Sequence, residues 1–156
     1  MAGKLAKGSA AALAIATLIG GFEGVRTYAY QDPVGIPTIC FGETRNVRTG
    51  EHKTLSECRA MLADRVVEFS RGVDACLKDE AAVPDQTYGA FVSLAYNIGV
   101  GAFCHSTLAR KANAGDLRGA CGQFPLWNKA HGIVLPGLVK RRAEEQALCL
   151  AGVEGS

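Results

Sequence analysis

Apolar residues recur every three or four positions through most of this chain, which is the spacing of helices with one buried face. Thr54 and Glu57 form a capping box, in which the two side chains accept hydrogen bonds from each other's backbone N–H groups where a helix begins. The apolar spacing that follows predicts one long helix over residues 55–77. Further helices are predicted from Pro84 to Gly99, over 107–114, over 116–124, and over 137–151 with Gly152 as the stop.

One short segment has a different pattern. Two runs rich in aromatic and β-branched residues flank a Pro-Val-Gly turn at residues 33–35, which is typical of a β-hairpin. With a three-residue loop, Tyr30 pairs with Thr38 and Asp32 pairs with Ile36. Paired residues, and residues two apart on one strand, share a face of the sheet. We therefore expect Asp32 and Thr38 on the same side of the hairpin.

Together these elements predict an α+β fold. A chain of 156 residues is the size of one compact domain. We expect a small hairpin lobe over about residues 24–54, a connecting helix over about 55–77, and a larger helical lobe over about 78–156. These three parts would form one domain over residues 23–156. Residues 1–22 would form a separate N-terminal helical segment before it.

The N-terminal segment carries Lys4 and Lys7, followed by fifteen uncharged residues over 8–22. A cleaved signal peptide is one interpretation, because residues 14–16 offer a small-x-small cleavage motif. Four apolar residues share one helical face: Ile15, Leu18, Ile19 and Phe22. An ordinary core helix is a second interpretation, and it would account for that stripe.

We favour a third interpretation, a weak transmembrane anchor that later leaves the bilayer. Fifteen helical residues span about 22 Å, which is short of the hydrocarbon core of about 30 Å. Alanine and glycine make up more than half of the segment, so its insertion is only marginally favourable. The two lysines before it favour an N-terminus in the cytoplasm. After release, the apolar stripe would pack onto the folded domain.

Six cysteines indicate a disulfide framework, and therefore a location outside the reducing cytosol. No two of them have the short spacing typical of a zinc site. Buried free thiols are the alternative. The sequence leaves many pairings open. We expect neighbours along the chain to pair: Cys40–Cys58, Cys76–Cys104 and Cys121–Cys149.

Charge and histidine content exclude several kinds of partner. The net charge is only +2, and the chain lacks a dense stripe of Lys and Arg, so we expect no nucleic-acid partner. The histidines His52, His105 and His131 are scattered along the chain, so we expect neither a bound metal nor another cofactor. We expect a monomer.

Glu23, Asp32 and Thr38 have the chemistry that glycoside hydrolysis requires. A glycosidase usually pairs one protonated carboxyl group with one ionised carboxylate. Glu23 follows an apolar helix, and an apolar environment favours the protonated form that an acid catalyst needs. Asp32 lies at a polar turn that suits an ionised base, and the Thr38 hydroxyl could hold a water molecule. On spacing alone, helix-end and turn-forming roles explain these residues equally well.

The segment from Phe22 to Thr44 resembles the active-site segment of the phage-type lysozyme family, glycoside hydrolase family 24. That family has a Glu, eight residues, an Asp, five residues and a Thr. Glu23, Asp32 and Thr38 keep both gaps. Motifs of the family's helical lobe follow at Tyr96–Gly99, Ser106–Leu108 and Gly137–Glu145, the last including Arg141 and Arg142, which we interpret as structural.

One position departs from the family pattern. The family commonly has His where this chain has Glu43. The structural pairing that this His makes is therefore in doubt here, whereas the three candidate catalytic positions are unaffected.

The resemblance implies a lysozyme-like fold and a muramidase that hydrolyses the β-1,4 bond from N-acetylmuramic acid to N-acetylglucosamine in peptidoglycan. It implies Glu23 as the acid, Asp32 as the base and Thr38 as an aid to catalysis. The N-terminus resembles that of the signal-anchor-release endolysins. This subgroup implies a form held in the host inner membrane, which is then released into the periplasm and lyses the host cell.

Two other functions stay open at this point. A lytic transglycosylase would cut the same bond with one Glu and no water, so Asp32 and Thr38 would be dispensable. A membrane-tethered module could also bind peptidoglycan without cutting it.

Overall fold

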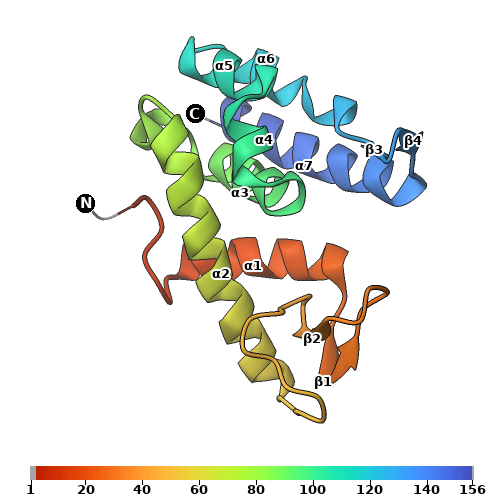
Figure 1. Ribbon diagram of the computed structural model, residues 1–156. Coiled ribbons are helices and arrows are strands. Elements are labelled where there is room, and N and C mark those ends of the chain that lie inside the picture. The colour runs from red at the N-terminus through yellow and green to blue at the C-terminus, as the bar shows by residue number, and fades with distance from the viewer. Residues whose placement is uncertain (1–2, 156) are drawn as a thin grey trace. The chain divides into compact units, whose positions relative to one another are not determined.

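The structure is a computed structural model that describes residues 3–155 (Figure 1). Its α-helices are α1 (Ala10–Glu23), α2 (Leu55–Cys76), α3 (Asp85–Ile98), α4 (Val100–Cys104), α5 (Thr107–Asn113), α6 (Leu117–Cys121) and α7 (Pro136–Glu154). Its strands are β1 (Arg26–Gln31), β2 (Pro37–Cys40), β3 (Lys129–Ala130) and β4 (Ile133–Val134). Two short 3-10 helices are η1 (Glu80–Ala82) and η2 (Phe124–Leu126). Helices with small antiparallel hairpins make the expected α+β fold.

The chain folds into two compact units. The hairpin unit is Leu5–Val67 and contains α1, β1, β2 and the first part of α2. The helical unit contains residues 3–4 and 68–155 of the described chain, and so holds the rest of α2 and every later element. The helix α2 therefore contributes residues to both. The boundaries expected from the sequence, an anchor over 1–22 and a catalytic domain over 23–156, stay a prediction.

The long helix α2 begins with the predicted capping box. Thr54 Oγ1 accepts a hydrogen bond from the backbone N–H of Glu57 at 3.1 Å. Glu57 Oε1 accepts one from the backbone N–H of Thr54 at 3.2 Å. Two backbone donors that the helix leaves without a partner are thereby satisfied.

The helix α1 packs one face into the hairpin unit. The Ser9 side chain caps it by accepting a hydrogen bond from the backbone N–H of Ala12 at 3.1 Å. The buried residues are Ala12, Ile15, Ala16 and Ile19, and Leu18 and Phe22 are half-buried. Gly20 permits a close approach, because a Cβ there would lie 3.1 Å from the Phe41 ring. Within residues 3–155, no helix combines the length and the hydropathy needed to cross a bilayer.

The first hairpin has the predicted register. Tyr30 pairs with Thr38 in the β1–β2 ladder. The backbone N–H of Asp32 donates to the carbonyl oxygen of Ile36 at 3.0 Å, so these two residues also lie opposite each other. The aromatic and β-branched pattern predicts a first strand over residues 28–32, whereas β1 begins two residues earlier, at Arg26.

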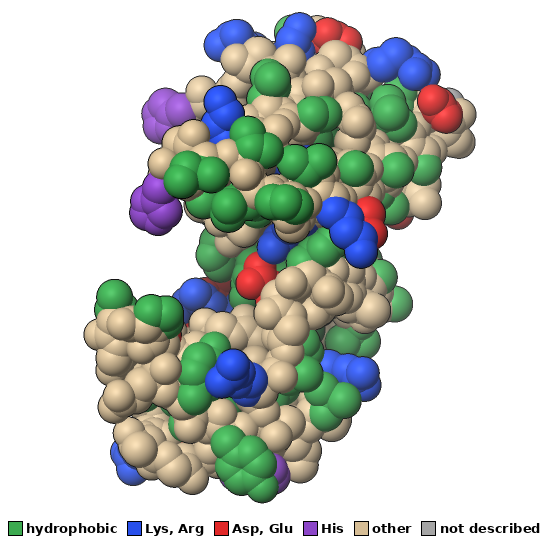
Figure 2. Space-filling view, turned by 90° about the vertical axis from the view of Figure 1, so that its right-hand side faces the viewer, with side chains coloured by type: hydrophobic (Ala, Val, Ile, Leu, Met, Phe, Trp, Pro, Cys, Tyr) green, Lys and Arg blue, Asp and Glu red, His purple; other side chains and the backbone are tan. Residues whose placement is uncertain are grey.

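The helical unit is built around α3 (Figure 1). Every residue of α3 from Thr87 to Ala95 is buried, whereas a surface helix buries only one face. Phe91 of this helix contacts Phe103 and Phe124, with ring centroids 5.8 and 6.4 Å apart. The helix α7 packs along α3. Elsewhere in this unit, hydrophobic side chains gather on the face drawn in Figure 2. Leu126 of η2 and Ile133 of β4 are among the exposed large hydrophobic residues of the unit.

Gly152 does not stop the last helix, contrary to the prediction. The helix α7 continues to Glu154. A Cβ at position 152 would lie 2.6 Å from the backbone nitrogen of Thr87 in α3. The glycine is therefore a site of close helix packing, and its backbone conformation does not end the helix.

Three further differences concern short elements. The helix α6 ends at Cys121, short of the predicted limit, and the chain continues into η2. The pattern did not predict α4, because Gly99 ends α3 with a φ of 96° and α4 begins at the next residue. The β3–β4 hairpin, with only two residues in each strand, was also not predicted.

All three predicted disulfides are confirmed. Cys40–Cys58 lies in the hairpin unit. Cys76–Cys104 and Cys121–Cys149 lie in the helical unit.

Charged residues of α7 form a buried cluster. Arg142 and Glu145 are both fully buried, and Arg142 Nη1 lies 3.1 Å from Glu145 Oε1. The Ser93 hydroxyl of α3 donates to Glu145 Oε2 at 2.5 Å. Burial raises the pKa of Glu145 above its ordinary value, while Arg142 and Ser93 oppose that shift. The cluster joins α7 to α3, which supports a structural role.

Lys4 makes several contacts within the helical unit, to which it belongs. Its ammonium donates to the carbonyl oxygens of Glu80, at 3.0 Å, and Val83. It also lies 3.7 Å from the Asp85 carboxylate and 4.9 Å from the centroid of the Tyr88 ring. The Lys4 side chain is only 15% exposed, so this charge is partly withdrawn from water.

Candidate active site

Glu23 is the last residue of α1. The helix ends because Gly24 adopts a φ of 73°, which glycine reaches without strain, and its N–H donates to the carbonyl oxygen of Gly20 at 3.2 Å. Glu23 is exposed, which differs from the apolar environment expected from the sequence. The reason is that the buried residues of α1 end at Ile19, one turn earlier.

Asp32 lies at the hairpin turn, and one of its carboxylate oxygens stabilises that turn. Oδ1 accepts hydrogen bonds from the backbone N–H groups of Val34, at 2.9 Å, and Ile36, at 2.8 Å. Such bonds are typical of an Asx turn, and Gly35 provides the positive φ of 84° within it. Among residues 3–155, no group donates to Oδ2, so this oxygen is available to a ligand.

Thr38 has a fixed side chain on the neighbouring strand. The residue is only 5% exposed, and its hydroxyl donates to the carbonyl oxygen of Ile36 at 2.9 Å. A hydroxyl has one proton and two acceptor lone pairs. Since the proton is already used, a water molecule bound at Thr38 must donate to Oγ1.

The hairpin brings Asp32 and Thr38 together. Tyr30 lies opposite Thr38, and Asp32 follows Tyr30 by two residues, so the pleat directs Asp32 and Thr38 to one side. Only Gly24 and Val25 separate Glu23 from the start of β1. All three candidate residues therefore belong to the hairpin unit.

Glu43 lies next to this site and has its own set of contacts. Its Oε1 accepts hydrogen bonds from the backbone N–H groups of Thr44 and Arg45, both at 2.9 Å. Its Oε2 lies 3.3 Å from Arg65 Nε on α2. Its backbone pairs with Ile39, the residue after Thr38, through two hydrogen bonds of 2.9 Å. Glu43 therefore ties the end of β2 to α2, and Arg65 is a supporting residue that the sequence did not reveal.

Neither a metal site nor an apolar groove accounts for these residues. Within the described chain, no three His, Cys, Asp or Glu side chains are grouped so that they could hold a metal ion. A groove of about 580 Å³ lies between α1 and α2 in the hairpin unit, and its lining includes Leu13, Phe41 and Leu62. Glu23, Asp32 and Thr38 are not among its lining residues.

Comparison with protein families gives one match over most of the chain. Residues 20–145 match the family described as phage lysozyme. The matched range includes Glu23, Asp32 and Thr38, and it extends to the buried Glu145.

Individual proteins are similar over nearly their whole length. The SAR-endolysin of Bacteriophage PS119 is 39% identical over 152 residues, which cover 92% of this chain and 90% of that protein. The muramidase domain of SpmX from Asticaccaulis excentricus is 31% identical with a TM-score of 0.80, covering 88% of this chain and 95% of that one. A mutant lysozyme of phage P22 is 30% identical with a TM-score of 0.81, covering 94% and 99%.

Proposed function

The chain belongs to the phage lysozyme family, and from that membership we infer that it is an endolysin with muramidase activity. It is a glycoside hydrolase whose substrate is peptidoglycan, and it lyses the host cell. The bond it hydrolyses is the β-1,4 linkage from N-acetylmuramic acid to N-acetylglucosamine. Similarity to proteins named endolysin and to a muramidase domain supports this conclusion.

We propose Glu23, Asp32 and Thr38 as the catalytic residues. A water molecule donates one proton toward Asp32 Oδ2 and the other to Thr38 Oγ1, which leaves an oxygen lone pair for the anomeric carbon. As the new C–O bond forms, Asp32 takes the proton of the water. Glu23 donates its proton to the departing glycosidic oxygen, so each carboxyl group performs one transfer.

One observation carries this assignment. The hydrogen bond from Thr38 to Ile36 makes the threonine oxygen an acceptor, while the turn leaves Asp32 Oδ2 without a donor among residues 3–155. The alternation of the strand puts the two residues on one side of the hairpin, and we propose that both oxygens accept from one water.

The test is the rate at which purified variants clear suspensions of outer-membrane-permeabilised Gram-negative cells. We expect Glu23→Gln and Asp32→Asn to lower this rate by at least about 100-fold. Thr38→Val should lower it by about 10- to 100-fold, because the water loses one of its two acceptors. Asn at position 32 keeps Oδ1 as an acceptor, so the turn and the thermal stability should persist.

A matched control is Asp64→Asn, which removes an exposed carboxylate of α2 in the same unit. It should clear cells at the wild-type rate. Wild-type clearance by Glu23→Gln would refute the assignment of the acid. No clearance by the wild-type protein would refute the muramidase itself and favour a module that only binds peptidoglycan.

Product analysis separates hydrolysis from transglycosylation. A muramidase adds water, so its muropeptides carry a reducing N-acetylmuramic acid. A lytic transglycosylase leaves a 1,6-anhydro sugar that is lighter by one water. We expect only the hydrated product by mass spectrometry, and the anhydro product would favour the alternative enzyme.

The relatives named SAR-endolysin imply a membrane-anchored form that is later released. We propose that residues 1–22 are this anchor, with the N-terminus in the cytoplasm, and that release delivers the protein to the periplasm. The outer face of α1 supports this proposal. The exposed residues of the helix before Glu23 are Ala10, Ala11, Leu13, Ala14, Thr17 and Gly21. A helix that only had to face water would gain solubility from charges there, but a membrane segment excludes them.

The contacts of Lys4 are consistent with the released form that this proposal requires. In the structure its ammonium contacts Glu80, Val83 and Asp85 of the helical unit. A lysine held in the cytoplasm could not reach a unit that lies across the membrane. The structure therefore corresponds to the released form of the proposed cycle.

The anchor is tested with Ala14→Lys, which places a charge at an exposed position of α1. We expect the free energy of unfolding of the purified variant to lie within about 0.5 kcal/mol of the wild-type value. In expressing cells, we expect the variant to be lost from the inner-membrane fraction. The matched control is Ala60→Lys at an exposed position of α2, which should leave the fractionation unchanged. Equal membrane recovery of Ala14→Lys and wild type would argue against the anchor.

A further inference from the structure

The helical unit contains a cavity that the muramidase proposal does not use. Its volume is about 450 Å³, within the usual range of small-molecule sites. Its lining residues are Lys78, Cys104, His105, Ser106, Arg110, Asn113 and Ala114. Two of these side chains carry a positive charge, a third can acquire one, and no lining residue is acidic.

The Cys76–Cys104 disulfide brings two of the basic residues to the same cavity. Lys78 follows Cys76 by two residues, and His105 directly follows Cys104. His105 Nδ1 lies 2.8 Å from the carbonyl oxygen of Gly101, which can only accept. The proton must therefore be on Nδ1, and Nε2 is left for another partner.

Asn113 connects α5, the helix that carries Arg110, to the C-terminal end of α2. Its Oδ1 accepts a hydrogen bond from the backbone N–H of Lys78 at 2.8 Å, and its Nδ2 donates to the carbonyl oxygen of Cys76 at 2.9 Å. Both ends of the amide are thus occupied by the protein itself. Arg110 lies three residues before Asn113 on α5, so the two share a helix face.

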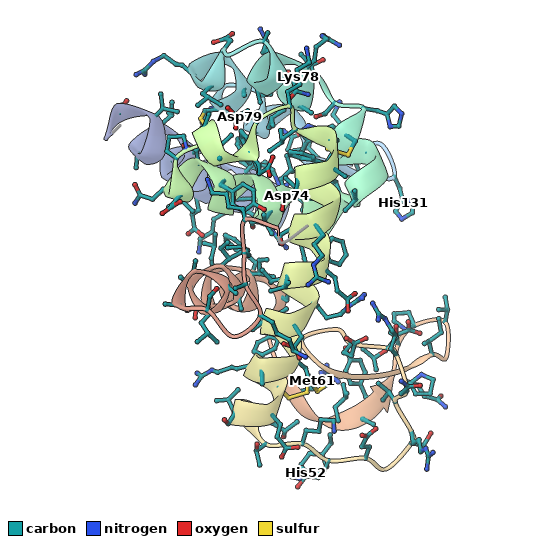
Figure 3. The ribbon with its side chains drawn as sticks, turned by 90° about the vertical axis from the view of Figure 1, so that its left-hand side faces the viewer. His52, Met61, Asp74, Lys78, Asp79 and His131 are labelled. Carbon is teal, nitrogen blue, oxygen red and sulfur yellow. A yellow bond between two sulfur atoms is a disulfide. The ribbon has the colours of Figure 1, made fainter. Side chains whose placement is uncertain are left out.

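The positive charges of the cavity are not balanced locally. Arg110 donates to the neutral hydroxyl of Thr107 at 3.2 Å, and within residues 3–155 neither Arg110 nor Lys78 forms an ion pair. The neighbouring Lys111, in contrast, lies 3.7 Å from the Asp116 carboxylate. Asp79 lines a second cavity of about 360 Å³, which shares Lys78 and Asn113 with the first. Figure 3 labels Lys78 and Asp79, which follow the C-terminal end of α2.

We propose that this cavity binds a phosphate group. Its two cationic side chains come from two elements, Lys78 from the segment after α2 and Arg110 from the α5 helix, and His105 can add a third donor there in its protonated form. A phosphate offers three or more acceptor oxygens and up to two negative charges, whereas a carboxylate offers two oxygens and one charge. The guanidinium of Arg110 is suited to bidentate contact with such an anion. The site stands independently of the muramidase activity.

The test is a titration of the full-length protein with inorganic phosphate, followed by two-dimensional NMR at constant ionic strength. We expect saturable shifts of the amide signals of Lys78, His105, Arg110 and Asn113. Lys78→Gln and Arg110→Gln should each weaken binding about fivefold, the effect of losing one exposed charge contact. Clearance of cells should be unchanged in both variants.

The matched control is Lys111→Gln, which removes the same charge from the same helix outside the cavity. It should bind phosphate as wild type does. Equal weakening in all three variants would mean that phosphate senses only net charge, and this would overturn the proposal. Shifts confined to other residues would overturn it as well.

A vesicle experiment distinguishes the sources of the phosphate. Vesicles of phosphatidylglycerol in phosphatidylethanolamine present it as a lipid headgroup, and phosphatidylcholine vesicles are the neutral comparison. The site is assigned to a lipid headgroup if the protein co-sediments with the phosphatidylglycerol vesicles, if inorganic phosphate releases it from them, and if Lys78→Gln no longer co-sediments. Binding of free phosphate without such co-sedimentation assigns it to small phosphate compounds.

Discussion

Glu43 occupies the position where the family pattern has His, and its contacts explain how this chain accommodates the change. The carboxylate uses one oxygen for two backbone N–H groups and the other for the Arg65 guanidinium. The two side chains are only 12% and 28% exposed, so their attraction is less screened than that of a surface pair. A histidine at this position would face the Arg65 guanidinium and could not form the ion pair that Glu43 forms.

We therefore predict that Glu43→His destabilises this protein more than Glu43→Gln does. Glutamine keeps the acceptor for the two N–H groups and loses only the ion pair, at a cost of about 1 kcal/mol in the free energy of unfolding. Histidine loses both and faces Arg65, so its cost should be about 2 kcal/mol. Urea unfolding measures both values. A histidine variant as stable as wild type would contradict the role assigned to Arg65.

The sequence could predict part of the geometry of the candidate site at the scale of single residues. The relation between Asp32 and Thr38 depends only on turn length and the alternation of a strand, which are local properties. The exposure of Glu23 depends on where the buried face of α1 ends, and no local pattern fixes that. Arg65 had no signal at all, because its partner lies on an element distant in sequence.

The capping box of α2 makes the stability of an element depend on pH. The backbone N–H of Thr54 donates to the Glu57 carboxylate, and this hydrogen bond lowers the pKa of Glu57 below its ordinary value of 4.5. The folded state therefore binds fewer protons than the unfolded state in mildly acidic solution. The contribution of the carboxylate is fully present above pH 4.5 and is lost as the pH falls through the lowered pKa.

We predict that Glu57→Gln removes this pH-dependent contribution while keeping an acceptor for Thr54. The difference in Tm between wild type and variant should be largest above pH 4.5 and should shrink as the solution becomes more acidic. Thermal unfolding followed by circular dichroism across the acid range measures it. A difference that stays constant with pH would show that the charge of Glu57 has no part in the cap.

Helix starts were easier to predict than helix ends, and the reason is physical. The side chains of Thr54 and Ser106 each accept a hydrogen bond from a backbone N–H group three residues later. The signal for the start of a helix is therefore contained in a few neighbouring positions. The prediction of a stop at Gly152 is wrong, because a glycine needed for close packing on Thr87 looks the same in sequence as one needed for a positive φ. The helix α4 was missed for a related reason, since Gly99 ends one helix immediately before another begins.

The three disulfides link the stability of the whole molecule to the compartment in which it folds. Two of them, Cys76–Cys104 and Cys121–Cys149, have the same sequence separation of 28 residues. A model based on the entropy of the unfolded chain assigns each about 3–4 kcal/mol. They differ in burial, because Cys121 and Cys149 are fully buried whereas Cys76 and Cys104 are half-buried.

We predict that replacing either pair by alanine lowers the free energy of unfolding by about 3–4 kcal/mol. The Cys121/Cys149 variant should lose about 1 kcal/mol more, because the missing sulfur atoms leave a cavity in the core. Denaturant unfolding of the two double variants measures this difference directly. Equal losses would show that the core closes around the smaller side chains.

The uncharged outer face of α1 also limits how this protein can be improved for use. Surface design would introduce pairs such as Ala10→Glu with Ala14→Lys, which add about 0.2–0.5 kcal/mol of helix stability and improve solubility. For a reagent that is purified and applied to bacteria from outside, such changes carry no penalty. For a gene that acts from inside its host, the proposed anchor predicts that the same charges would remove the membrane-held form. An optimised laboratory enzyme and a working phage gene would therefore need different sequences in this one helix.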